Sequence, residues 1–337
     1  MIPRRCSSCA APTGAGDRFC ESCGQRLLPT SQWLSSTTRG GTCAFCTSGD
    51  IDRDGYCGEC GRRRSPGRDR VELDLGSIAA VTDRGPHRRR NEDAAGIGRA
   101  GSAIAGIVCD GIASTVRADE AAHAAVNAGI VALARDLSDG ASPAVAARAS
   151  FRHALAAVTV VGERLGTETP PSCTYASAIA KDGTIVVCWV GDSRIYWLPA
   201  RDEDGGPVCL TVDDSLAGQL AAAGLRVAAD LGADGAALIR WLGADADNVE
   251  PHLGSLHPAG PGRLVLCSDG LSRYLAGPAD LVGGRAEQPG AAARRLAQTA
   301  LDAGGHDNIT VIVIDVQSRA GPDGSHHPTI PEGGSRP

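Results

Sequence analysis

The sequence predicts an α+β fold in which blocks of strands form a sandwich, preceded by two small cysteine-rich modules. Three observations support this prediction. Strand-like segments come in consecutive groups, two long alanine-rich helical segments follow one another directly, and eight cysteines near the N-terminus repeat at a fixed spacing. One-for-one alternation of strands with helices would instead indicate a parallel doubly wound sheet. A length of 337 residues accommodates one large domain and two small modules.

The N-terminal cysteines form Cys-x-x-Cys pairs in two copies, with ten residues between the pairs of each copy. They are Cys6, Cys9, Cys20, Cys23, Cys43, Cys46, Cys57 and Cys60. Two such pairs at this spacing are a signature of a tetrahedral structural zinc site. We therefore predict a double zinc ribbon over residues 1–62, with modules at 1–28 and 40–62, two Zn²⁺ ions and a Ser/Thr/Gly-rich connector at 29–42. Redox-active pairs are the alternative, but those usually occur singly.

A charged linker at 63–70 leads into the main domain, which we place at 71–316. Apolar runs typical of strands open this domain. These runs are 73–82, 94–97 and 103–109. Alanine-rich helices are expected at 115–137 and 143–165, because in the first of them apolar residues recur on one helical face.

The second half of the domain repeats the pattern of grouped strands and single helices. The expected strands are 174–180, 184–190, 194–198, 249–253, 262–267 and 309–316. The sequence Lys181-Asp182-Gly183 suits a tight hairpin turn between the first two of these. Helices are expected at 214–223 and 290–303. The tail at 317–337 is rich in Gly, Pro, Ser and His, so we expect it to be disordered.

Charge and hydropathy narrow the class of protein. The net charge is −6, and residues 1–70 carry 11 Arg against 7 Asp and Glu, a formal +4 that leaves −10 for residues 71–337. An acidic main domain argues against nucleic-acid binding there. No apolar stretch has the length needed to span a bilayer, and the first residues lack the apolar run of a signal peptide. We therefore expect a cytoplasmic protein.

Aspartates stand at the ends of several apolar strands. Asp110, Asp192 and Asp269 each follow one, and Asp307 precedes the last. Converging carboxylates are the ligands that Mg²⁺ and Mn²⁺ prefer, with water completing the coordination. Turn chemistry or helix capping is the alternative for any single aspartate. Asp192 in particular can simply brace a turn.

The order of short motifs along this domain resembles that of the metal-dependent protein phosphatases, the type 2C serine/threonine class. The motifs are Arg88-x-x-Asn91-Glu92-Asp93, Val108-Cys109-Asp110-Gly111, Ser172-Cys173-Thr174-Tyr175-Ala176, Gly191-Asp192-Ser193-Arg194, Leu210-Thr211-x-Asp213-Asp214, Arg240-Trp241-Leu242-Gly243, Ser268-Asp269-Gly270-Leu271 and Asp307-Asn308-Ile309-Thr310. The match covers residues 74–316. The resemblance implies a four-layer αββα sandwich of two antiparallel sheets flanked by helices.

The resemblance also implies the roles of the site residues. Asp110 bridges two Mn²⁺ or Mg²⁺ ions, and Asp269 and Asp307 complete the first site. The Gly111 carbonyl and the pair Glu92-Asp93 serve the second, with either acid as the direct ligand. Asp192 and Asp269 hold a third, weaker ion. Arg88 clamps the phosphate, a role that suits the guanidinium fork.

The implied activity is hydrolysis of phosphoserine or phosphothreonine in proteins by a water that the two metal ions activate. Some relatives have a histidine after Asp-Gly that is thought to protonate the leaving group. This chain has Ile112 there, so water on the metal or His306 would take that role. The alternatives are a catalytically silent phosphoprotein-binding module and a nucleic-acid-directed adaptor that acts through the ribbons. We favour ribbons that bind protein.

Five further cysteines, Cys109, Cys173, Cys188, Cys209 and Cys267, lie on expected strands or at their edges, and we expect them to pack as small hydrophobes.

Overall fold

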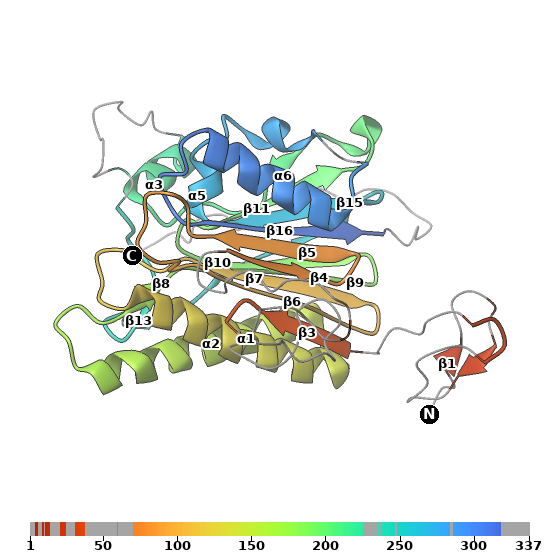
Figure 1. The fold of residues 1–337 in the computed structure, drawn as a ribbon, viewed down its shortest axis with the longest axis horizontal. Helices are drawn as coiled ribbons and strands as arrows, with labels where there is room; N and C mark the ends of the chain where they lie inside the picture. The colour runs from red at the N-terminus through yellow and green to blue at the C-terminus, as the bar shows by residue number, and fades with distance from the viewer. Residues whose placement is uncertain are drawn as a thin grey trace.

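The structure, a computed structural model, describes residues 4–5, 9, 11–13, 21–24, 31–37, 59, 70–224, 235, 237–246, 248–283 and 286–317. Within these residues two six-stranded antiparallel sheets stack face to face (Figure 1). The first has the strand order β14-β10-β9-β7-β6-β3 and the second β12-β11-β15-β16-β5-β4. The prediction of an α+β fold is confirmed, with two antiparallel sheets and flanking helices.

The strands of the first sheet are, in chain order, β3 (Ser31–Ser35), β6 (Ala94–Ala100), β7 (Ala103–Cys109), β9 (Tyr175–Lys181), β10 (Thr184–Val190) and β14 (His252–Leu256). Those of the second are β4 (Arg70–Asp74), β5 (Ile78–Asp83), β11 (Arg194–Pro199), β12 (Val208–Cys209), β15 (Gly262–Cys267) and β16 (Ile309–Val316). Short pairs complete the set: β1 (Arg4–Arg5) with β2 (Pro12–Thr13), and β8 (Ser172–Cys173) with β13 (Leu242–Gly243).

Helices cover the outer face of each sheet (Figure 1). α1 (Ala118–Ser138) and α2 (Pro143–Leu165) lie on the first sheet, and α6 (Pro289–Asp302) lies on the second. The shorter helical segments are α3 (Leu216–Ala222), α5 (Asp269–Ser272), η1 (Asp202–Asp204) and η3 (Pro278–Leu281). By length and composition α2 could also cross a membrane, contrary to our expectation that no segment could. Here it buries one face against α1 and the sheet, as a core helix does.

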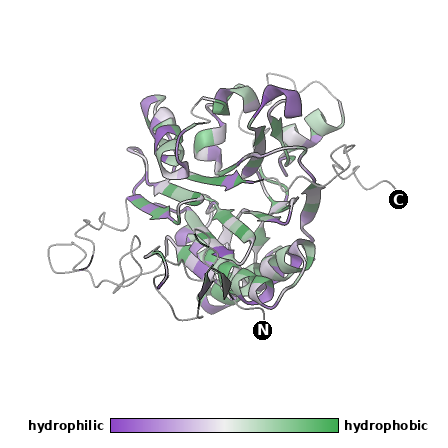
Figure 2. Cartoon of the chain, turned by 90° about the vertical axis from the view of Figure 1, so that its right-hand side faces the viewer, coloured by the Kyte–Doolittle hydropathy of each residue, from purple (hydrophilic) through white to green (hydrophobic). Residues whose placement is uncertain are grey.

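Three apolar layers hold the sandwich together, one between the sheets and one under each set of helices. Alanine dominates the layer below α1 and α2, which allows these helices to approach the sheet closely. The bulkiest contacts are few, such as the edge-on packing of Phe151 against Tyr175. Figure 2 shows hydrophobic residues gathered on the strands in the middle of the molecule. Burial of apolar surface is the main stabilising term for such a stack.

Two expected strands differ from those observed. The expected single strand at 73–82 is the hairpin of β4 and β5, because Gly76 adopts a φ of +82° and its amide donates to Asp74 Oδ1 over 2.8 Å. The expected strand at 249–253 lies at His252–Leu256. At the first of these places the local polar residues favour a turn where apolar periodicity alone predicts extension.

The predicted connector at 29–42 requires a correction. Residues Ser31–Ser35 form β3, which pairs antiparallel with β6 at the edge of the first sheet. Trp33 lies over Gly98, where an added Cβ would fall 2.0 Å from the indole ring. The Ser36 amide donates to the Ala95 carbonyl over 2.8 Å. A segment between the two cysteine modules is therefore part of the main domain.

Most of the predicted ribbon residues, and the tail at 318–337, lie outside the described residues. Of the eight predicted zinc ligands only Cys9 and Cys23 are described, and both are exposed.

Candidate active site

The aspartates at the strand ends converge on one cleft of about 580 Å³. Asp110 follows β7 and Asp192 follows β10 in the first sheet, while Asp269 follows β15 and Asp307 precedes β16 in the second. All four line the cleft, together with Arg88 and Gly111. Antiparallel pairing places these particular strand ends at one end of the sandwich, which explains why residues so distant in sequence meet.

Burial and mutual repulsion raise the pKa values of these carboxyls. The pKa of Asp110 is well above its usual range, first because the group is buried and then because Asp93, Asp269 and Asp192 repel its charge. Burial, with repulsion from Asp269, raises the pKa of Asp192 to about 7. Burial also raises the pKa of Asp269. Such a cluster is fully ionised only beside compensating positive charge, which divalent cations supply.

Asp93 and Glu92 lie at the start of β6 and differ in their surroundings. Asp93 is buried, and burial raises its pKa to about 7. Ser268 Oγ donates to its Oδ2 over 2.8 Å, but its Oδ1 has no hydrogen-bond partner among the described residues. A buried carboxylate oxygen without a partner is costly, and a metal-bound water or a metal would satisfy it. Glu92 is partly exposed, and its pKa is raised mainly by burial.

Two arginines engage the carboxylates from the second sheet. Arg88 Nη2 donates to Asp307 Oδ2 over 2.6 Å. Arg273, on the turn after Asp269, donates to Asp269 and lies 3.3 Å from the same Asp307 oxygen. Among the described residues no three acidic, histidine or cysteine side chains already stand as a metal-ligand set. Both Asp269 and Asp307 are thus engaged by arginine in this structure.

Close backbone contacts fix the positions of the two loops that carry Asp110 and Asp269. The Gly111 amide donates to the Glu92 carbonyl over 3.2 Å, and a Cβ on Gly111 would lie 2.8 Å from that oxygen. A Cβ on Gly270 would lie 1.9 Å from the backbone oxygen of Asn308. Glycine is thus required at both positions by space, as expected for Asp-Gly at a ligand cluster.

Two motif residues without a predicted role act as positioning groups. Thr174 Oγ1 accepts from the Asp110 amide over 3.0 Å. The Asn308 side chain accepts from the Glu92 amide over 2.8 Å and donates to the carbonyls of Arg84 and Arg90. Asn308 thereby ties the loop of Arg88 to the strand start of Glu92. The sequence signal that could have identified Thr174 and Asn308 is that both lie within the short motifs.

His306 does not line the cleft. Its ring is exposed and lies beside that of His87, with the ring centroids 5.1 Å apart. The cleft is lined by Ile112, Leu238 and Trp241 among others, but not by His306. The structure thus gives no support to His306 as the leaving-group acid.

The five cysteines of the main domain pack inside the fold. Four are buried and Cys209 is partly buried, and none forms a disulfide. Burial raises the pKa values of Cys109, Cys188 and Cys267, that of Cys188 to about 12. A thiol with a raised pKa is a poor nucleophile, so the prediction of a packing role is consistent with the structure.

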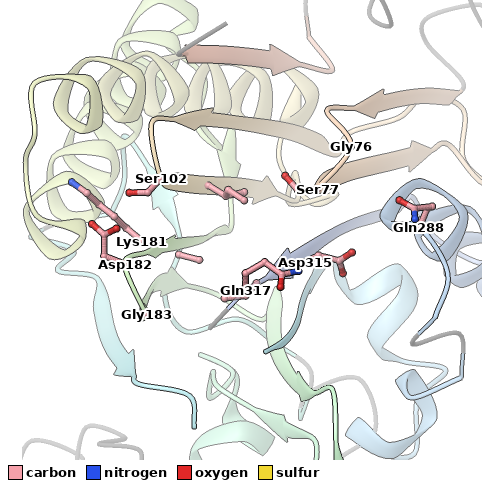
Figure 3. A pocket seen from close by; sticks show the side chains of 12 residues that line it. Gly76, Ser77, Ser102, Lys181, Asp182, Gly183, Gln288, Asp315 and Gln317 are labelled. Carbon is pink, nitrogen blue, oxygen red and sulfur yellow. The ribbon is translucent and has the colours of Figure 1, made fainter. Parts of the chain in front are cut away.

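A second hollow, of about 460 Å³, lies at the opposite end of the sandwich (Figure 3). It is formed by the turns at 76–77, 102 and 181–183 and by the end of β16. Its acids are Asp182 and Asp315, and the second is paired with Arg263 over 2.7 Å. It therefore lacks the concentration of carboxylates found in the first cleft.

Residues 87–301 match the sequence profile of the family described as Protein phosphatase 2C. The serine/threonine protein phosphatase PstP of Mycobacterium tuberculosis is 30% identical over 250 residues, which are 73% of this chain and 46% of that protein. The chain thus spans about half the length of the curated relatives it matches.

The fold is similar to solved structures of the same kind. The M. tuberculosis PstP crystal structure is 27% identical with a TM-score of 0.59 over 73% of this chain and all of that one. The PstP catalytic domain in complex with two manganese ions is 28% identical with a TM-score of 0.58, covering 71% of this chain and 98% of that one.

Proposed function

The chain belongs to the protein phosphatase 2C family, and we propose that it is a metal-dependent phosphatase that hydrolyses phosphoserine and phosphothreonine in proteins. The observation that carries the proposal is the convergence of Asp110, Asp269 and Asp307 with Arg88 in one cleft. A catalytically silent binding module would have no need for this whole set. The likeness to PstP, a serine/threonine protein phosphatase, supports the same activity.

The cofactors in this proposal are two Mn²⁺ or Mg²⁺ ions. Asp110 would contact both, with Asp269 and Asp307 at the first ion, and the Gly111 carbonyl with Glu92 or Asp93 at the second. Asp192 and Asp269 would hold a third, weaker ion. The raised pKa values and the unpartnered Asp93 oxygen fit such ligation, as do the two manganese ions bound to the PstP catalytic domain. When bound, the ions would supply positive charge and lower the pKa of a water.

The chain's own residues orient the reaction. Arg88 is partly exposed at the cleft, so its guanidinium can exchange the Asp307 carboxylate for two phosphate oxygens. Thr174 holds the Asp110 backbone, and Asn308 holds that of Glu92. Ile112 offers no proton, so the leaving alkoxide would take its proton from solvent in the cleft.

For the N-terminus we propose two zinc ribbons that bind a protein partner, in a protein of the cytoplasm. The cysteine spacing supports the zinc ions. The unbridged thiols of the main domain are consistent with a reducing compartment. β3, which lies between the two modules in sequence, pairs with β6 at the edge of the first sheet. Zinc content of the purified chain, with two ions expected, tests this part; a metal-free N-terminus would refute it.

The test of the activity is phosphate release from a phosphothreonine peptide with Mn²⁺ or with EDTA. The expected result is Mn²⁺-dependent release that falls by at least about 100-fold in Asp269→Asn, since one ligand at a reacting centre is worth several kcal/mol. Asp302→Asn, at the exposed end of α6, is the matched control and should retain activity. No release from folded, zinc-loaded protein would favour the silent module. Salt-dependent DNA binding through the ribbons would favour the adaptor.

A further inference from the structure

The residues that line the active-site cleft form two chemically different sets. One set is the converging aspartates and Arg88. The second set combines apolar side chains with two further carboxylates: Ile112, Leu238, Trp241, Glu168 and Asp245. The residues of this second set have no place in the metal centre or the phosphate clamp, so they are free to contact the rest of a substrate.

Trp241 is the largest side chain of this second set, and its indole is hydrogen-bonded. Its ring is partly exposed, and its Nε1 donates to Asp245 Oδ1 over 3.0 Å. The next residue, Leu242, is buried and pairs with Cys173 in the β8–β13 ladder. Cys173 in turn forms a bridge with Gly111, which follows Asp110. The indole is therefore connected through a short, ordered stretch of backbone to the centre of the catalytic site.

The two carboxylates of this set lack a cationic partner within the described residues. Glu168 and Asp245 are exposed, and no arginine or lysine of the described chain forms an ion pair with either. The acids on the catalytic side differ, because Asp269 and Asp307 are both paired with arginine. A partly exposed indole that is hydrogen-bonded to one such carboxylate, with a second in the same cleft, is complementary to a guanidinium or ammonium group.

We propose that this second set of cleft residues binds an arginine or lysine side chain of the phosphoprotein substrate. That basic residue would flank the phosphorylated residue. The cation would stack on Trp241 and pair with Glu168 or Asp245. The inference rests on the proposed function, because it assumes that a phosphorylated peptide enters this cleft. It assigns a substrate class, namely phosphorylation sites with a nearby basic residue.

The test uses the full-length, Mn²⁺-loaded protein and phosphothreonine peptides that differ only in carrying arginine, glutamine or glutamate beside the phosphothreonine. Both kcat/KM and the equilibrium binding of fluorescent peptides are measured. For the wild type we expect a preference for arginine over glutamine of about 3- to 30-fold, the range for a partly desolvated cation–π contact with added charge attraction.

The variants Trp241→Leu and Glu168→Gln should each reduce that arginine-to-glutamine ratio toward one, whatever their absolute rates. Glu163→Gln, which removes an exposed acid near the end of α2 that does not line the cleft, should leave the ratio unchanged. Because both peptides are measured on the same protein sample, the arginine-to-glutamine ratio is unaffected by a loss of folded or metal-loaded protein.

Different outcomes bear on different claims. Turnover without a preference for arginine, or a preference that survives in both cleft variants, would overturn the inference and leave the proposed activity intact. A preference for arginine in binding, with no turnover of any peptide, would support the inference and refute the activity.

Discussion

Gly98→Ala should detach β3 from the edge of the first sheet. An added Cβ would fall 2.0 Å from the Trp33 ring, so either the indole or the strand has to move. The position is informative because Gly98 pairs directly with Trp33 across the β3–β6 ladder. The change adds one methyl group and leaves the charge of the chain unaltered.

The expected magnitude follows from the surface that Trp33 buries. Its ring is partly buried, and covering roughly 100 Å² of apolar surface stabilises by about 2.5 kcal/mol. Losing part of that contact, about 1.4 to 2.5 kcal/mol, would increase the opening of β3 by about 10- to 60-fold. Trp33 and Leu34 pack against the core clusters but are only partly buried, so the thermal unfolding of the remaining domain should change less than the opening of β3.

Hydrogen exchange is the direct assay. The Ser36 amide donates to the Ala95 carbonyl, so it should exchange faster in Gly98→Ala, while amides in β9 keep their protection. In a Trp33→Ala background the same change should be neutral or slightly stabilising, since glycine weakens a strand interior. Unchanged exchange at Ser36, or an equal effect in both backgrounds, would refute the role assigned to Trp33.

Three further predictions concern the active site. Gly270→Ala places a Cβ 1.9 Å from the Asn308 carbonyl oxygen and should lower the free energy of unfolding by about 2–4 kcal/mol. In the control Gly277→Ala the new Cβ meets nothing within 4 Å, so the free energy of unfolding should change little. Equal losses of stability in thermal unfolding would contradict the steric argument. Asp192 has its pKa raised to about 7, above the unfolded value, so the protein in EDTA should lose stability as pH rises from about 4 to about 7. Asp192→Asn should flatten that slope, and an unchanged slope would be evidence against a raised pKa. Arg273→Gln should tighten Mn²⁺ binding by about 3- to 10-fold in calorimetry, because it removes a cation that pairs with Asp269 and Asp307, two of the proposed metal ligands. Weaker binding would show that Arg273 supports the site instead.

Much of the site could be predicted because it resides in short local signals. An apolar strand followed by Asp-Gly can be recognised in the sequence alone, and Asp110 and Asp269 were identified in this way. Their convergence follows once the strands are antiparallel neighbours in two stacked sheets. The glycines could be anticipated for the same reason, since close backbone approach requires them.

Other features depend on contacts that no local pattern encodes. β3 is a short, serine-rich strand whose only large apolar residues are Trp33 and Leu34, and its pairing is decided by space above Gly98. Arg273 reaches Asp307 only because α5 turns back toward β16. Trp241 belongs to a motif, but its position at the cleft became visible only with the fold of the 237–246 segment.

The central claim is that the strand-end carboxylates bind the metal ions on which catalysis depends. The most direct measurement is Mn²⁺ binding and phosphate release, followed together in one titration of metal-free protein and of Asp110→Asn. The account predicts that the wild type gains activity as about two Mn²⁺ ions bind per chain, and that Asp110→Asn loses both binding and turnover. Turnover that persists in EDTA, or that survives Asp110→Asn with Mn²⁺ binding intact, would contradict it.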